Sequence, residues 1–309
     1  MIMLLVLLAG CSSAVQPTEQ EAPGEQPSDP AGQTPAQEPS GTEAPDETID
    51  DEDAWRINII STAGDLLWSF TEGELKRLPP ELACDFSHAY STINNWPTPR
   101  FYAAEGYSVE GILQAAGVLD TAQTVTFRAA DGYEAGLTRE QLLSPQFFYP
   151  QVGEKDNGAI QVKPIIAYRW RDGTDDLSEV YENKISLIFG QRNPFEHTNP
   201  AFVANVSEII VDDAPSETWA AADTFPPAGP IAEGETVKLQ HPLYGLVKLH
   251  YTLDGSDPTP LSTMYNPSTF QPELNKPIPI TGPTTIKVLV TGYGKNDSEI
   301  AEFEFWSVG

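Results

Sequence analysis

The sequence has few cysteines, histidines and basic residues, and each shortage argues against a class of function. Its 309 residues include 2 cysteines, 4 histidines and 17 lysines and arginines against 45 acidic residues, a formal net charge of −28. A surface so negative repels phosphate backbones, so we expect no nucleic-acid partner. The histidines, at positions 88, 197, 241 and 250, are too dispersed to indicate a metal site. The glycine-rich loop of nucleotide-binding proteins and the Gly-x-Ser-x-Gly motif of serine hydrolases are also absent.

The one long apolar run lies at the N-terminus and is too short to cross a membrane as a helix. Residues 1–10, MIMLLVLLAG, run directly into Cys11, and a run of that length suits the core of a signal peptide. Leu8-Ala9-Gly10-Cys11 matches the bacterial lipobox, in which the cysteine thiol receives a diacylglyceryl group, although no Lys or Arg precedes the run. We therefore expect a signal peptide over 1–11 and a lipid on Cys11. Such a protein is exported and anchored to the outer face of the bacterial cytoplasmic membrane.

Residues 12–53 contain almost no apolar side chains and no basic residue. They hold 12 of the 45 acidic residues and 7 of the 28 prolines. Such a segment cannot offset its ordering entropy by burying apolar surface, and its like charges repel. We predict a disordered acidic tether. The remainder keeps 33 acids against 17 bases, so we expect the lipid on Cys11, and not charge, to bring the protein to the membrane.

Residues 54–214 combine short helix patterns with short strand patterns. Four apolar, β-branched segments are typical of strands: RINIIST (56–62), VKPIIAYRW (162–170), KISLIFG (184–190) and VSEIIV (206–211). Capping boxes begin at Thr71 and Thr138, and Ser108 is placed to cap a third helix. Asp131-Gly132 predicts a hairpin turn. Because helices and strands do not alternate regularly, we predict an α+β domain, a mixed sheet with helices packed around it.

The order of several segments in this region resembles a known family. The segments are FTEGELKRLPP (70–80), WPTPRFYAAEGYSVEGILQAAGV (96–118), TVTFRAADGYEAGLTREQLL (124–143), PIIAYRW (164–170) and VSEIIV. They resemble sulfite-oxidase-like molybdopterin-binding domains, and more closely the small version found in exported proteins of anaerobic bacteria. The resemblance covers most of residues 54–214. It implies the molybdopterin-oxidoreductase fold, with molybdopterin as the cofactor.

One residue that the family uses for its chemistry is missing at the matching place. Molybdenum in this family sits on a pterin dithiolene and takes one protein cysteine, because a soft thiolate suits the metal. The resemblance places that ligand near Ser91 or Thr92, in AYSTINNW (89–96). Cys84 lies several residues too early, and a small buried hydrophobe is the favoured interpretation of it. Cys84 is thus a weak candidate as metal ligand or catalytic thiol, and we expect the fold without the catalytic metal.

Residues that would hold the pterin phosphate are scattered. Five arginines are available as cationic forks: Arg100, Arg128, Arg169, Arg171 and Arg192. Arg100 and Arg192 lie in predicted loops with aromatic neighbours, which makes them the stronger candidates for cofactor binding. Trp96 is a further candidate. It and the tyrosines at positions 90, 102 and 107 either line a pocket or pack in the core.

GQRNPFEHTNPAF, residues 190–202, is a long polar loop after a buried strand, a position where α/β sheets usually bind ligands. His197, with Glu196 beside it, is a candidate acid–base residue or cofactor ligand. The favoured alternative is that Asn193, His197 and Asn199 only satisfy the loop's own backbone.

The last part of the chain has an all-β pattern. Residues 215–228 have the Pro/Ala/Ser composition of a linker. In VKLHYTL (247–253), Lys248 and His250 alternate with Val247 and Leu249, as expected for a strand. YTLDGSDPT (251–259), Tyr265 and TTIKVLVTGYGKNDSEIAEFEF (284–305) closely resemble the chitobiase/β-hexosaminidase C-terminal module, an immunoglobulin-like (Ig-like) sandwich. That resemblance spans about 75 residues and implies a spacer or accessory domain, without glycosidase activity.

We therefore predict a multidomain lipoprotein with an α+β domain at 54–214 and an all-β Ig-like sandwich at 229–309. The leading hypothesis is a degenerate molybdopterin-oxidoreductase domain that acts as a binding or scaffold module. The first alternative is a molybdopterin-dependent oxidoreductase. The second is an adhesion module for cell-wall glycan or a surface protein, with the sandwich as the natural candidate for that contact.

Overall fold

The computed structural model describes residues 55–79, 82, 85–94, 96–154, 158–232, 234–269 and 271–308. The predicted signal peptide, Cys11, the tether and Cys84 lie outside these residues. Residues from Ile49 onward belong to one compact unit. Strands make up 47% and helices 11% of the structure, so the helices are short additions to β-sheets. None of the helices described is long and apolar enough to cross a membrane.

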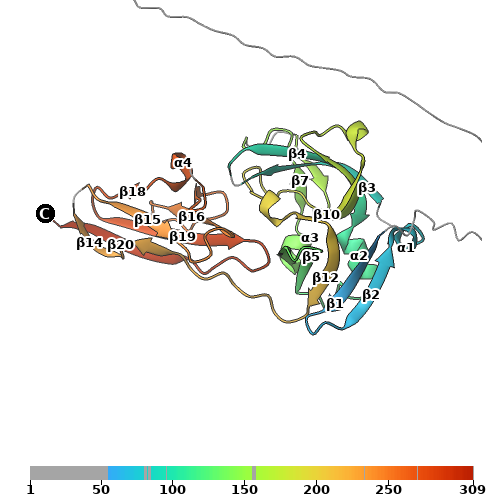
Figure 1. Cartoon of the computed structure of the whole chain (residues 1–309). Coiled ribbons are helices and arrows are strands. Elements are labelled where there is room, and N and C mark those ends of the chain that lie inside the picture. The colour runs from blue at the N-terminus through green and yellow to red at the C-terminus, as the bar shows by residue number, and fades with distance from the viewer. Residues whose placement is uncertain are drawn as a thin grey trace, which may run out of the picture. The chain divides into compact units, whose positions relative to one another are not determined.

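The first of two five-stranded sheets between residues 56 and 212 is mixed, as the sequence predicts (Figure 1). Its order is β2-β1-β12-β5-β6. The strands are β1 (Arg56–Ser61), β2 (Leu66–Thr71), β5 (Thr124–Ala129), β6 (Glu134–Thr138) and β12 (Val206–Asp212). β1 runs parallel to β12, while the other neighbours are antiparallel. Gly132, with φ of 90°, closes the predicted Asp131-Gly132 turn between β5 and β6.

Three short α-helices in this part of the chain begin where the capping patterns place them. They are α1 (Glu72–Lys76), α2 (Val109–Ala115) and α3 (Arg139–Leu143). In α1 and α3 both reciprocal hydrogen bonds of a capping box are present, from Thr71 with Glu74 and from Thr138 with Gln141. Ser108 caps α2 by accepting a hydrogen bond from the Gly111 amide.

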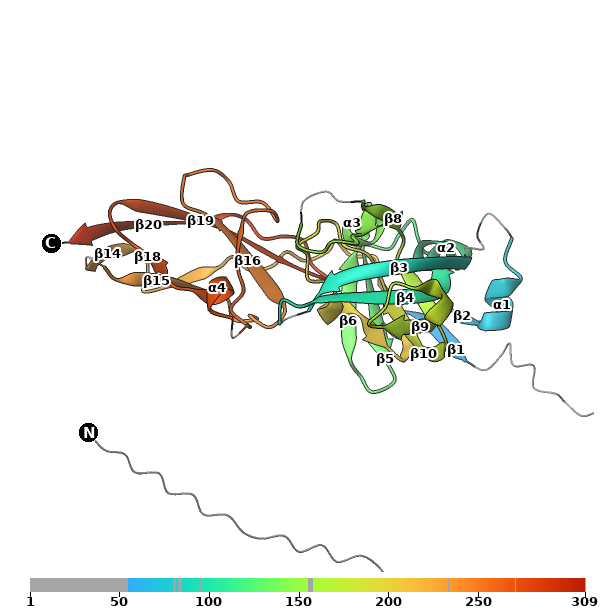
Figure 2. The same ribbon diagram turned by 90° about the horizontal axis from the view of Figure 1, so that it is seen from above.

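The second sheet is antiparallel throughout, with the order β11-β10-β9-β4-β3. Its strands are β3 (Asp85–Ile93), β4 (Pro99–Ser108), β9 (Ile165–Asp172), β10 (Glu182–Ile188) and β11 (Val203–Ala204). Figure 2 shows the long strands β3 and β4 side by side. A two-stranded sheet of β7 (Gln146–Phe148) and β8 (Ile160–Val162) and the 3-10 turns η2 (Leu177–Glu179) and η3 (Asn199–Ala201) complete this part.

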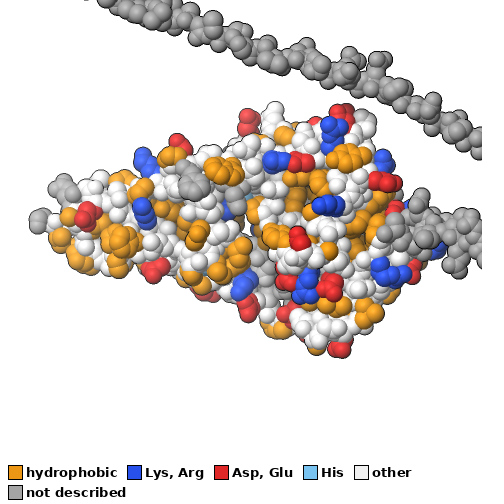
Figure 3. Space-filling model, in the orientation of Figure 1, with side chains coloured by type: hydrophobic (Ala, Val, Ile, Leu, Met, Phe, Trp, Pro, Cys, Tyr) orange, Lys and Arg blue, Asp and Glu red, His pale blue; other side chains and the backbone are white. Residues whose placement is uncertain are grey.

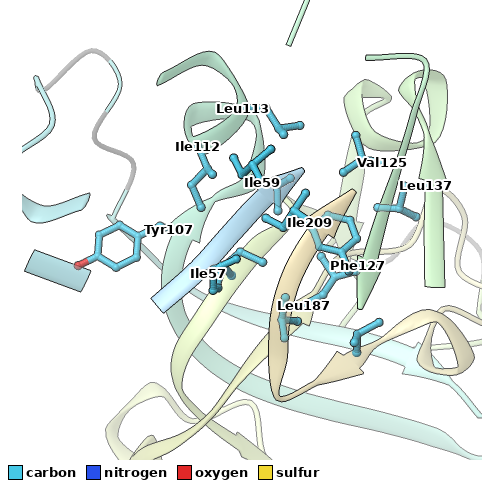
Figure 4. Packing of buried hydrophobic residues seen from close by; sticks show 14 of the residues in the cluster. Ile57, Ile59, Tyr107, Ile112, Leu113, Val125, Phe127, Leu137, Leu187 and Ile209 are labelled. Atoms are coloured by element: carbon cyan, nitrogen blue, oxygen red, sulfur yellow. The ribbon is translucent and has the colours of Figure 1, made fainter. Parts of the chain in front are cut away.

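One core lies between the two sheets and under α2. It contains Ile59 and Ile209 of the mixed sheet and Leu187 of the antiparallel sheet, all essentially unexposed. Figure 4 shows Ile112 and Leu113 of α2 packed above these strands. Full burial of each such side chain contributes roughly 1.5–3 kcal/mol relative to exposure. A second cluster, on the other face of the antiparallel sheet, includes Tyr90, Tyr102, Phe148 and Ile165.

The C-terminal part is a sandwich of two sheets. One has the order β13-β15-β18, with β13 (Asp223–Phe225), β15 (Thr236–Gln240) and β18 (Ile278–Pro279). The other has the order β14-β20-β19-β16-β17, with β14 (Gly229–Ala232), β16 (Val247–Thr252), β17 (Thr263–Tyr265), β19 (Thr284–Gly292) and β20 (Ala301–Val308). A one-turn helix, α4 (Pro272–Asn275), lies between β17 and β18. The core of the sandwich contains Val237, Val247, Val288 and Phe305.

Residues 215–228, predicted to be a linker, belong to the sandwich. They include β13, which pairs with β15, and Trp219 and Ala222, which are 6% and 7% exposed in the sandwich core. The Pro/Ala/Ser composition suggested a boundary, but one tryptophan buried in a hydrophobic core outweighs that local composition. A fragment beginning at residue 229 would lack part of its own core.

Candidate functional site

The place where the resemblance puts the metal ligand is filled by side-chain hydrogen bonds. Ser91 and Thr92, at the end of β3, are both 0% exposed. The Ser91 hydroxyl donates to Gln191 Oε1 at 2.6 Å and accepts from the Tyr149 amide at 2.8 Å. Thr92 Oγ1 accepts from the amides of Thr198 and Asn199 at 3.1 and 2.8 Å. These hydroxyls fasten the 190–202 loop to β3, and their donor and acceptor capacity is used in doing so.

All five arginines considered for the pterin phosphate are paired with carboxylates. Arg100 pairs with Asp172, and Arg192 pairs with Glu196. The others pair in the same way: Arg128 with Glu134 and Glu208, Arg169 with Glu105, and Arg171 with Glu179. On the face shown in Figure 3, lysines and arginines lie beside acidic residues and do not gather into one cationic patch. A phosphate would have to displace a carboxylate at each arginine.

The aromatic residues considered for cofactor binding do not line a common pocket either. Trp96 is 59% exposed. Tyr90 and Tyr102 belong to the core of the antiparallel sheet, and Tyr107 to the core between the sheets. Neither the hydroxyls at 91 and 92 nor the paired arginines fit a molybdenum pterin. The residues described here therefore do not form the cofactor site that the resemblance implies.

Polar residues of the 190–202 loop form hydrogen bonds both within the loop and with residues outside it. Asn193 accepts from the Phe195 amide, which is the local role expected for it. Asn199 instead reaches outside the loop and donates to the Tyr102 hydroxyl at 2.9 Å. Burial acts to lower the pKa of Arg192, but Glu196 beside it outweighs burial and holds the pKa above its usual value. His197 lines a cavity.

We call this hollow of about 230 Å³ the junction cavity. It lies between the 190–202 loop, β6 and the sandwich strands β16 and β19. Apolar side chains from both parts of the chain form much of its wall, among them Phe195, Leu246 and Met264. An adjoining, more open hollow of about 400 Å³ shares Phe195, Met264, His197 and His250 with it. A cavity with mostly apolar walls and a few polar groups is the usual form of a small-molecule site.

His197 and His250, 53 positions apart in the sequence, both line the junction cavity. Burial lowers the pKa of His197 to about 3 and that of His250 to about 4. Both rings are therefore neutral near pH 7. The backbone of Asn94 accepts a hydrogen bond from His197, while Nδ1 has no hydrogen-bond partner among the described residues. Because one nitrogen donates to Asn94, Nδ1 is left as a buried acceptor.

Two further polar residues line the same cavity. Trp219 is 6% exposed, and its indole N–H has no acceptor within the described part of the chain. Lys248 of β16 also lines the wall, and burial lowers the pKa of its ammonium to about 8. Tyr293 lies below the Arg192 guanidinium, which is 5.7 Å from its ring centre. Burial and the nearby Glu196 raise the pKa of its hydroxyl.

Hydrogen bonds connect α3 with the turn that follows β19, beside the cavity. Gln141, the third residue of α3, donates through Nε2 to the carbonyls of Gly292 and Lys295 at 2.8 and 3.0 Å. Its Oε1 accepts from the Gly294 amide at 3.0 Å and from the Thr138 amide of the capping box. One glutamine thus caps a helix and fixes the turn that follows β19. Three backbone partners of that turn converge on it.

The sequence drew attention to His197 and Arg192 but did not reveal Lys248, His250 and Trp219. Lys248 and His250 lie on the polar face of an alternating strand, a pattern typical of a solvated face. In the structure His250 is 4% exposed, and both residues line the junction cavity together with residues of the 190–202 loop. Among the described residues, no group of three or more His, Cys, Asp or Glu side chains could hold a metal ion.

Comparison with known proteins agrees with the sandwich. Residues 226–302 match the family model of the chitobiase/beta-hexosaminidase C-terminal domain, which confirms the resemblance seen in that part of the sequence. A search of the curated proteins gave no match to the chain. The matched segment begins after Trp219, although that residue belongs to the sandwich core. The resemblance of residues 54–214 to molybdopterin-binding domains stays a prediction.

Proposed function

We propose that this protein is a surface-anchored binding protein, held by a lipid on Cys11 at the outer face of a bacterial membrane. In this proposal residues 54–214 are a molybdopterin-oxidoreductase-like domain that has lost its metal and serves as a scaffold for ligand binding. The sandwich, which matches a module from carbohydrate-processing enzymes, is the accessory domain that completes the binding surface.

The observation that carries the proposal is the hydrogen bonding of Ser91 and Thr92. A metal site needs a ligand atom with a free lone pair facing an open coordination space. Here both hydroxyls are fully buried and bonded to the 190–202 loop. Neither hydroxyl is therefore available to a metal.

Metal analysis of the full chain tests this part of the proposal. The protein is produced in a host that makes and inserts molybdopterin, with Cys84→Ser prepared beside it. We expect no stoichiometric molybdenum in either protein. Molybdenum at about one atom per chain that disappears in Cys84→Ser would make the protein an oxidoreductase with Cys84 as ligand. Molybdenum that survives the substitution would contradict the ligand argument itself.

The anchor has its own test. We expect the protein to partition into detergent and Cys11→Ala to release it in soluble form, because a lipid on that thiol is the proposed membrane contact. Unchanged membrane association of Cys11→Ala would contradict the lipoprotein assignment and leave the scaffold proposal standing.

A further inference from the structure

The junction cavity and the adjoining hollow present mainly apolar surface to whatever enters them. Phe195 and Met264 line both, while Leu246 lines the first and Leu261 the second. Leu246 and Leu261 are 65% and 66% exposed, so each contributes to its wall from the solvent side. A buried water needs about two to four polar partners, and walls of this kind offer few. The two hollows therefore suit an apolar ligand better than water.

The charged side chains in the wall of the junction cavity already have partners. Arg192 pairs with Glu196, and Glu134 pairs with Arg128. The Lys248 ammonium donates to a backbone carbonyl of its own strand. An ionic ligand would have to leave water and displace one of these partners, and burying a charge without a counter-charge is costly. The wall therefore selects against anions and cations.

Several uncharged polar atoms in the same wall are also engaged or covered. The Tyr133 hydroxyl donates to the Pro200 carbonyl at 2.5 Å. His197 Nδ1 and Trp219 Nε1 have no partner within the described chain, but both atoms are buried beneath the surface. Trp219 Nε1 lies where a Cβ on Gly292 would be. A ligand rich in hydroxyls would therefore lose hydrogen bonds to water and regain few in the cavity.

The size of the junction cavity and the groups around it indicate a ligand with one or two rings. Its volume is about 230 Å³, and an apolar cavity of about 150 Å³ is enough to bind benzene. Aromatic rings pack favourably against other aromatic rings and against thioether sulfur. Phe195, Met264 and the uncharged rings of His197 and His250 line the cavity and provide such groups. The adjoining hollow of about 400 Å³ offers room for a substituent.

We propose that the junction cavity binds a small uncharged aromatic molecule of one or two rings, held by apolar contacts with Phe195, Leu246 and Met264. This inference rests on the proposed binding function and gives it a site and a ligand class. Metal analysis and detergent partitioning test other parts of that function, so their failure and the failure of aromatic binding can be told apart. Because the 190–202 loop and the sandwich both contribute walls, a bound ring contacts both.

One methionine reports directly on this site. The chain has three methionines, Met1, Met3 and Met264, and Met264 lines the cavity. In the full chain, isotopically labelled at the methionine methyl groups, the Met264 NMR signal is assigned by its loss in Met264→Leu. The uncharged probes are indole and naphthalene, and the comparison probes are 2-naphthoate and D-glucose. We expect an uncharged probe to shift the Met264 signal saturably, through the ring current of the bound ring, and the comparison probes to leave it unchanged.

Two exposed leucines provide a variant and its matched control. Leu246→Asn places an amide in the wall of the cavity and should weaken binding of the uncharged probe at least about fivefold, because a bound ring would desolvate that amide. Leu253→Asn makes the same change at a leucine that is 48% exposed and lies outside both walls. It should bind like the parent. Because both leucines are largely exposed, we expect both variants to melt within a few degrees of the parent.

Three results would overturn the proposal. The first is an unchanged Met264 signal with both uncharged probes up to their solubility limits. The second is equal affinity for naphthalene and 2-naphthoate, which would contradict the ligand class. The third is equal binding by the parent and Leu246→Asn, which would place the ring elsewhere. Should Leu246→Asn melt early, Leu246→Ala, which only removes apolar contact, decides this last point.

Discussion

The 190–202 loop has two sides, and buried polar groups are treated differently on each. On the β3 side, Ser91 and Thr92 make four hydrogen bonds with residues of the loop. On the side facing the sandwich, His197 Nδ1 and Trp219 Nε1 have no partner within the described residues. All four of these side chains are more than nine-tenths buried. Burial alone therefore does not distinguish the two sides of the loop, whereas the state of their hydrogen bonds does.

This difference separates the two main hypotheses about the protein. The region where the enzyme family would hold its metal is the satisfied one, and it behaves as ordinary core. The unsatisfied region is formed partly by the sandwich, which the enzyme hypothesis treats as an accessory.

Lowering the pH should produce the largest loss of stability, because it protonates His197 and His250, which line the junction cavity. His197 and His250 have pKa values of about 3 and 4 in the folded protein, against about 6.5 in the unfolded chain. Between those values the unfolded state binds more protons, so stability is complete above pH 6.5 and falls as the pH falls towards 4. Each histidine costs up to about 1.4 kcal/mol per pH unit in this window, or about 4 kcal/mol for both near pH 5. Urea denaturation near pH 7 and near pH 5 measures this loss.

The double variant His197→Phe/His250→Phe is the control for that experiment. It should lose much less stability between the two pH values, because the phenyl rings do not titrate. The many carboxylates of the chain titrate in both proteins, so their contribution cancels in the difference. Identical pH profiles for the parent and the double variant would show that neither histidine is buried in its neutral form.

The next largest effect is expected for Thr92→Val, on the β3 side of the loop. We compare its loss of free energy of unfolding with that of His197→Phe, on the side facing the sandwich. Thr92→Val keeps the side-chain shape but leaves the amides of Thr198 and Asn199 without their acceptor. Two buried unpaired amides should cost about 2–4 kcal/mol. His197→Phe loses one bond to Asn94 but also removes an unpaired nitrogen, so we expect a cost of about 1 kcal/mol or less. Urea denaturation at neutral pH gives both values, and equal costs would contradict the distinction between the two sides.

The features that the sequence predicted correctly are those that depend on neighbouring residues. The capping boxes at Thr71 and Thr138 and the turn at Asp131-Gly132 each involve residues at most three positions apart. Their hydrogen bonds and backbone angles are therefore determined by the local sequence. The alternation in β16 also identified the core side of that strand, since Val247 and Leu249 are both 0% exposed.

The site could not be predicted in the same way because distant segments form it. Lys248 and His250 occupy the polar face of a strand, and nothing near them in the sequence shows that both line a cavity together with residues of the 190–202 loop. Trp219 lies in a segment whose composition is that of a linker, yet it packs in the sandwich core. For His197 the residue type was informative, but only the three-dimensional arrangement showed that one ring nitrogen donates to Asn94 and that the residue lines a cavity.

Arg100→Gln should have the smallest effect, and it tests whether any arginine outside the junction is kept for an anion. Arg100 and Asp172 form an ion pair whose side chains are 40% and 35% exposed. Exposed pairs of this kind contribute about 1 kcal/mol or less, so we expect Arg100→Gln to lower the free energy of unfolding by no more than that. Asp172→Asn is the matched control and should behave alike. If Arg100 served a pterin phosphate, millimolar pyrophosphate would raise the melting temperature of the parent and not that of Arg100→Gln. We expect equal melting curves with and without pyrophosphate in both proteins, because the carboxylate of Asp172 already occupies the guanidinium.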